Sequence, residues 1–237
     1  MHNVKKLAHP KGFWETGMEK TEAKKPYFSS FLTRIGGIFL APEATFTQII
    51  TDKIGFWEPL LLVVLLFAIQ GAVIASFASR ILSAISESAG FEFSLAFLNI
   101  VLFAMITAMI IATLIAWVVL AGIAHLGAKY VFKGQGSFTQ LMKLYGYAFV
   151  PYSLMIFGVV LFGLSWTLWP FTLFFNTLTS FWVVLLMATA VKQNYKLDIG
   201  KAFISSFIGP MLLWLAAIVI SWAWMWLFID TFTGGFL

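Results

Sequence analysis

Long apolar runs without charge near their middles constrain this chain more than any other feature. A helix needs about 20 residues to cross about 30 Å of hydrocarbon, and five runs are long enough. They cover residues 57–79, 93–126, 140–164, 169–191 and 203–228. The chain is 61% hydrophobic and only 11% charged, so a water-soluble domain would lack the polar side chains to cover its surface. The runs are continuously apolar, which predicts membrane-spanning helices rather than the alternating strands of a barrel.

Lysine and arginine lie almost entirely at one end of these predicted helices. Of the 15 basic residues, all but Arg80 lie before the first run, or in and just after the loops that follow the second and fourth runs. Cytoplasmic loops of membrane proteins are enriched in these residues. The sequence therefore predicts a multi-pass protein of the cell membrane, with a cytoplasmic N-terminus and the C-terminus on the opposite side.

The chain ahead of the first run divides into two parts. Residues 1–27 are polar and are predicted to form a cytoplasmic tail. In residues 28–55 apolar side chains recur at three- and four-residue steps, and Pro42 suits a first helical position, with Phe46 on the apolar face that follows. We predict two short amphipathic helices here, which lie either on cytoplasmic lipid or against the bundle. Residues 56–237 complete an all-α integral membrane protein with five transmembrane helices.

The loop before the third run turns from polar to apolar within a few residues. It reads "KGQGSFTQLMKLYGYAFVPY". Gly134 and Gly136 predict a tight turn; a phosphate cradle would need a longer Gly-Lys-Ser pattern after a strand. Ser137 is a candidate helix cap, and Pro151 should kink the helix because proline lacks a backbone donor. Lys143 either reaches the cytoplasmic interface or lies against the amphipathic segment.

Two segments of the chain resemble the Yip-one domain family, five-span membrane proteins named for interaction with Ypt/Rab GTPases. One is "LAPEATFTQIITDKIGFWEPLLL", and the other is "LGAKYVFKGQGSFTQLMKLYGYAFVPY". The residues that carry the resemblance are Pro42, Phe46, Trp57, Pro59, Gly134, Gly136, Ser137, Phe138, Tyr145, Gly146, Tyr147 and Pro151. The short lysine-rich tail and the "DKIGFWEP" run differ from the longer tail and acidic "DLWGP"-like element of eukaryotic members. The resemblance therefore implies a prokaryotic member and the family's N-inside, five-span fold.

No residue pattern in the chain indicates catalysis, a cofactor or a metal. The chain has no cysteine, its three histidines are scattered, and no nucleophile stands beside a base. The predicted spans carry no ionisable side chain at mid-depth, which argues against a proton-coupled carrier. We expect a non-enzymatic protein that organises membrane or recruits membrane or cytoplasmic proteins at its cytoplasmic face, without nucleic acid. Candidate contacts to anionic lipid there are Lys129, Lys133, Lys192, Lys196 and Lys201.

Two other classes of function stay open from the sequence. Gln70, Asn99 and Asn176 lie inside predicted spans, where they either line the path of a small-molecule transporter or channel, or form hydrogen bonds between helices. The chain is also compatible with an accessory subunit of a larger membrane complex. Small residues four apart in the first run, from Gly71 to Ser79, suit either a homo-oligomer seam or packing within the bundle.

Overall fold

The computed structural model describes residues 27–90 and 94–233, and within these ranges every regular element is a helix. The predicted tail of residues 1–27 lies outside them, apart from Tyr27. The elements are α1 (Tyr27–Leu40), α2 (Pro42–Thr51), α3 (Trp57–Ala89), α4 (Leu95–Leu126), the π-helix η1 (Gly127–Val131), α5 (Phe138–Ala148), the 3₁₀-helix η2 (Val150–Leu154), α6 (Met155–Leu164), the 3₁₀-helix η3 (Trp166–Leu168), α7 (Trp169–Tyr195) and α8 (Ile199–Thr233).

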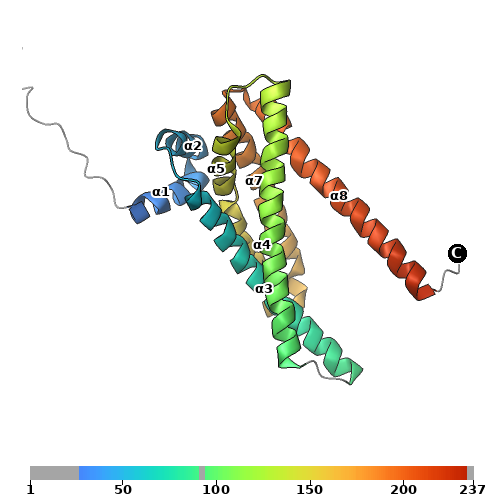
Figure 1. The fold of residues 1–237 in the computed structure, drawn as a ribbon. Coiled ribbons are helices and arrows are strands. Elements are labelled where there is room, and N and C mark those ends of the chain that lie inside the picture. The colour runs from blue at the N-terminus through green and yellow to red at the C-terminus, as the bar shows by residue number, and fades with distance from the viewer. Residues whose placement is uncertain (1–26, 91–93, 234–237) are drawn as a thin grey trace, which may run out of the picture.

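Among the described residues, four helical stretches are long and apolar enough to cross a membrane. They are Trp57–Ser88, Leu95–Val131, Phe138–Leu161 and Pro170–Tyr195. The prediction of a multi-pass helical membrane protein is thus confirmed for these four stretches. The fifth predicted span, 203–228, falls on α8, whose fully described apolar part is Ile199–Ile208, so that span stays a prediction. Figure 1 shows α8 leaving the end of α7 and diverging from the other long helices.

The third predicted span is broken where its proline lies. Helix α5 ends at Ala148, and the chain tightens into η2, which contains Pro151, before it resumes as α6. Proline removes one backbone donor and crowds the preceding turn, so the regular α-helix is interrupted. At the start of α5, the side chain of Ser137 accepts a hydrogen bond from the backbone nitrogen of Gln140 at 3.3 Å. The predicted kink and the predicted helix cap are both confirmed.

The two short helices, α1 and α2, pack against the bundle on one face. Ile38 of α1 and both Phe46 and Ile49 of α2 are fully buried in the main hydrophobic core. Phe28 and Leu32, which belong to the same apolar stripe of α1, stay exposed at its edge. Of the two arrangements that the sequence left open, the structure therefore adopts bundle packing, while α1 keeps part of its apolar stripe exposed.

The core lies at one end of the bundle, where α1, α2 and α5 meet the start of α3 and the adjoining ends of α4 and α7 (Figure 1). Trp117, Tyr145 and Tyr147 are among its largest fully buried side chains. The loop from α4 to α5 and the junction from α7 to α8 lie at this same end. It is the end at which the sequence concentrates lysine, and the candidate functional residues gather here.

Candidate functional site

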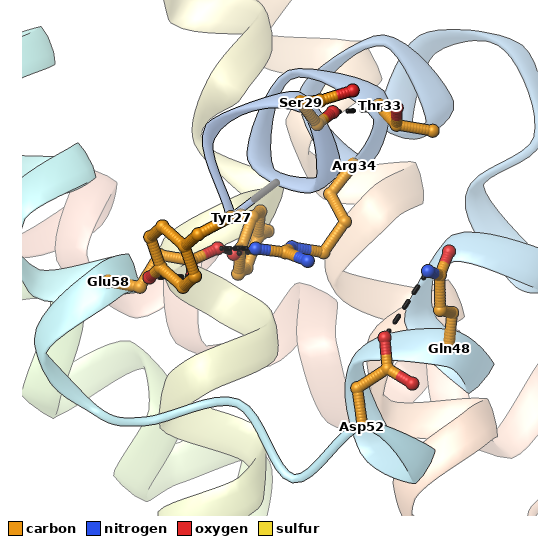
Figure 2. Close-up of polar contacts among 8 residues, drawn as sticks. Tyr27, Ser29, Thr33, Arg34, Gln48, Asp52 and Glu58 are labelled. Carbon is orange, nitrogen blue, oxygen red and sulfur yellow. Dashed lines mark hydrogen bonds and ion pairs between the residues drawn. The ribbon is translucent and has the colours of Figure 1, made fainter. Parts of the chain in front are cut away.

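A buried ion pair joins α1 to the start of α3. The guanidinium Nη2 atom of Arg34 lies 2.6 Å from Oε1 of Glu58, and its Nε atom lies 3.1 Å from the same oxygen. The side chains are only 3% and 5% exposed, respectively. Figure 2 shows Arg34 reaching from α1 toward Glu58, with the ring of Tyr27 beside them; the Gln48–Asp52 contact of α2 is separate. A buried pair of opposite charges therefore connects two elements that are far apart in the sequence.

Two tyrosines complete the environment of the Glu58 carboxylate. The hydroxyl groups of Tyr27 and Tyr147 both donate hydrogen bonds to it. The Nε atom of Arg34 also donates to the Tyr147 hydroxyl oxygen at 3.2 Å, and the guanidinium carbon lies 6.0 Å from the centre of the Tyr27 ring. The hydrogen bond to Glu58 raises the pKa of Tyr27 above its ordinary value of 10.0, and burial adds to this rise. Each buried charge is paired and hydrogen-bonded, as stability requires.

Two further polar contacts join the middle of α5 to its neighbours, one to the linker between α2 and α3 and the other to α4. The Lys143 ammonium group donates to the backbone oxygen of Ile54 at 2.6 Å, so this lysine lies against the segment after α2, as one of its two predicted placements required. The indole nitrogen of Trp117 donates to the backbone oxygen of Met142 at 3.0 Å, and its ring stacks on Phe56. These contacts fix α3, α4 and α5 relative to one another at this end.

The glycines of the loop before α5 lie against the C-terminal end of α7. A Cβ atom on Gly134 would lie 2.7 Å from Cβ of Tyr195, and one on Gly136 would lie 2.6 Å from the backbone oxygen of Asn194. The backbone nitrogen of Gln135 donates to the Tyr195 oxygen at 3.3 Å, and the Asn194 side chain donates to the Ser137 oxygen at 2.9 Å. The predicted turn is present, and its glycines allow a close approach to the protein's own backbone.

The other residues that carry the family resemblance lie at helix contacts of the same end or close to it. A Cβ atom on Gly146 would lie 2.6 Å from Cβ of Pro59, so α5 and α3 cross closely here. Tyr145 is fully buried, and Phe138 contacts the ring of His125, with 5.6 Å between ring centres. Pro42 begins α2 and Phe46 is buried, whereas Trp57 is 74% exposed. Most of these residues therefore shape the packing, whereas Trp57 lies on the surface.

The five lysines predicted to contact anionic lipid differ in their surroundings. Lys192 is paired with Glu43 at 2.6 Å, and Lys201 is paired with Asp198 at 3.2 Å. Lys129, Lys133 and Lys196 are exposed. The pKa of Asp198 lies below its ordinary value because the backbone nitrogen and the side chain of Lys201 both donate hydrogen bonds to it.

The three residues predicted as a polar path have different neighbours. Gln70 is buried on α3, and its amide nitrogen donates to the backbone oxygen of Tyr152 at 2.6 Å, which is a bond between helical segments. Asn99 and Asn176 are exposed on α4 and α7. Among the described residues, no three side chains of the His, Asp and Glu types are grouped as a metal site would need.

The Arg34–Glu58 pair was not recognised from the sequence. Arg34 is one of the basic residues ahead of the first apolar run, and Glu58 lies at the start of that run. One signal was available: Arg34 stands between Phe31, Ile35 and Ile38, on the apolar face of its own helix. A charge on that face needs a buried partner of opposite sign, and Glu58 is the acidic residue at the start of the next long helix.

The fold and this end of the molecule define a multi-pass, all-helical membrane protein whose short leading helices pack against the bundle. The Yip1 domain family model matches residues 36–221, so the chain belongs to the Yip1 domain family. An uncharacterised protein of Methanocaldococcus jannaschii is 34% identical over 110 residues, which cover 46% of this chain and 74% of that relative. This relative is prokaryotic, in agreement with the predicted prokaryotic membership. No solved structure matches the chain.

Proposed function

We propose that this Yip1-family protein is a non-enzymatic scaffold that holds a membrane-associated protein at its cytoplasmic face and organises the membrane by doing so. The working surface would be formed by Phe28 and Leu32 of α1 together with Trp57 at the start of α3; we name these three side chains the α1 surface. The observation that carries the proposal is the buried Arg34–Glu58 pair, because it fixes this surface in one position.

Exposure and residue type both support a binding role for the α1 surface. Phe28 is 69% exposed and Trp57 is 74% exposed, although both are large apolar side chains close in the chain to the buried Arg34–Glu58 pair. Aromatic side chains contribute strongly to protein interfaces when a partner buries them. A surface that is already rigid loses little conformational entropy on binding, which favours affinity.

Transport is supported less well than scaffolding. A solute path needs polar groups that remain available to a solute, but the buried amide nitrogen of Gln70 already donates to Tyr152. Asn99 and Asn176 lie on exposed helix faces, where no neighbouring helix encloses them. In the described part of the chain, Arg34 and Glu58 are the most deeply buried charged residues. They form an ion pair with each other, so neither charge is left for a solute.

Photo-crosslinking in native membranes tests the proposal. A photoreactive phenylalanine analogue placed at position 28 or 57 should give a discrete protein adduct, and the same analogue at Phe103 is the control. Phe103 is similarly exposed but lies within the apolar part of α4. Substituting Glu58→Leu should weaken the adduct at position 28 by releasing α1. Adducts to lipid alone, or the same protein adducts from position 103, would overturn the assignment, and so would solute flux through liposomes that contain the purified protein.

A further inference from the structure

An apolar slot lies between the end of α4 and the beginning of α8, away from the α1 surface. Its volume is about 400 Å³, which is within the range of small-molecule sites, about 300–1,000 Å³. Six of its lining residues carry the argument: Leu126, Gly127 and Tyr130 on the α4–η1 side, and Ile204, Ser205 and Ile208 on α8.

The local backbone on both sides shapes this slot. Residues Gly127–Val131 form a π-helix, a rare distortion that is frequent at functional sites. Gly127 and Ser205 form a close contact, since a Cβ atom on Gly127 would lie 3.3 Å from the Ser205 hydroxyl oxygen. That hydroxyl donates to the backbone oxygen of Lys201 at 3.0 Å, so its single donor is already engaged. The slot therefore suits a ligand segment without hydrogen-bonding groups.

One lysine lies beside the slot, on its α8 side. Lys201 lies one turn before Ile204 and Ser205, on the same face of α8. Its side chain is 55% exposed, with Asp198 as its ion-pair partner. The exposed Tyr130 ring is of the type that lies at the boundary between hydrocarbon and headgroups. An apolar slot thus meets positive charge at one end of the membrane-spanning helices.

We propose that this slot binds one acyl chain of an anionic phospholipid, with its phosphate headgroup against Lys201. A hydrocarbon chain gains little by leaving other chains of the bilayer, because both surroundings are apolar. The shape of the slot therefore determines where the acyl chain binds, and the positive charge beside the slot determines which headgroup is preferred. Each lysine near an anionic membrane surface contributes attraction that corresponds to about a fivefold preference. Asp198 weakens this preference, because its carboxylate forms an ion pair with Lys201 and competes with the lipid phosphate.

Native mass spectrometry of the purified full chain, equilibrated with equal amounts of phosphatidylglycerol and phosphatidylcholine, measures the preference directly. We expect phosphatidylglycerol to be retained over phosphatidylcholine. Lys201→Gln should reduce the ratio about fivefold, whereas Lys53→Gln, the same change at an exposed lysine after α2, should leave it unchanged. Asp198→Asn should raise the ratio by a similar factor, because the amide oxygen still caps α8 while the competing charge is lost.

A steric variant tests the slot separately from the charges. Ile208→Trp fills the slot and should abolish lipid retention, while Phe207→Trp adds bulk to α8 outside the lining and should not. Equal ratios for Lys201→Gln and Lys53→Gln, or full retention by Ile208→Trp, would overturn the proposal. The experiment is independent of the scaffold proposal, because none of these residues belongs to the α1 surface and crosslinking at position 28 does not depend on them.

Discussion

Replacing Glu58 with leucine should release α1 from the rest of the bundle. In the wild-type protein, Arg34 is 3% exposed and its charge is balanced by Glu58 at 2.6 Å. After Glu58→Leu, the guanidinium group keeps one hydrogen bond from this cluster, to the Tyr147 hydroxyl at 3.2 Å. A buried charge without its counter-charge is strongly unfavourable, so α1 should leave its site to hydrate Arg34.

The size of the effect follows from the environment of each partner. Removing one member of a buried ion pair costs about 3–5 kcal/mol, and we expect this range for Glu58→Leu. Arg34→Met should cost less, about 1–3 kcal/mol, because the hydroxyls of Tyr27 and Tyr147 still stabilise the Glu58 carboxylate. Combining Arg34→Met with Glu58→Leu removes both charges and should restore stability to within about 1 kcal/mol of wild type.

Hydrogen exchange of the α1 amides, followed by mass spectrometry in mild detergent, reports this local opening. A loss of about 3–5 kcal/mol corresponds to exchange that is faster by roughly a hundredfold to several thousandfold, up to the limit set by unprotected amides. Peptides from α7 serve as the internal reference, since α7 contributes no side chain to the pair. Unchanged α1 exchange in Glu58→Leu, or a double variant no more protected than Glu58→Leu, would show that the pair does not anchor α1.

Two further predictions concern a helix crossing and a tyrosine. Gly146→Ala should lower the free energy of unfolding by about 1–3 kcal/mol in detergent denaturation, because its methyl group would meet Pro59 at 2.6 Å. The control is Gly36→Ala, where a methyl group would have no neighbour within 4 Å. This variant should be neutral or stabilising by up to about 1 kcal/mol. The raised pKa of Tyr27 means that its contribution to α1 docking is fully present below pH 10.0 and is lost as the pH rises through that raised value. Ultraviolet titration of wild type against Tyr27→Phe should therefore isolate a tyrosine that ionises above pH 10.0; ionisation at or below that value would contradict the contact.

The features that the sequence predicted correctly are those that depend on neighbours along the chain. Apolar length determined the spanning helices, Pro151 determined the break between α5 and α6, and Ser137 with the preceding glycines determined the turn and cap. Each of these depends on local backbone chemistry, so no tertiary information was needed. The first predicted span ends at residue 79, because charge marks the end of an apolar run and not the end of a helix. The helix continues to Ala89, and Arg80 donates to the backbone oxygen of Gly163 at 3.2 Å.

The candidate site depended on tertiary pairing and was only partly predictable. A single sequence gives the apolar face of α1 but not the surface that it meets, so Arg34 counts only among the cytoplasmic basic residues although it pairs with Glu58. Likewise, "GQG" indicated a turn, but only the structure shows that it lies against Asn194 and Tyr195. The α4–α8 slot has no signature in the sequence, because its two walls are about 80 residues apart and each reads as an ordinary apolar helix.

Cysteine accessibility tests most directly whether the lysine-rich end, with the α1 surface, faces the cytoplasm. The chain contains no cysteine, so any labelling reports the introduced residue alone. Gln135→Cys lies in the exposed loop between α4 and α5, and Glu87→Cys is exposed near the end of α3. In intact cells, a membrane-impermeant thiol reagent should label position 87 and leave position 135 unlabelled until the cells are opened. Labelling of position 135 but not 87 would reverse the orientation and remove the cytoplasmic scaffold from consideration.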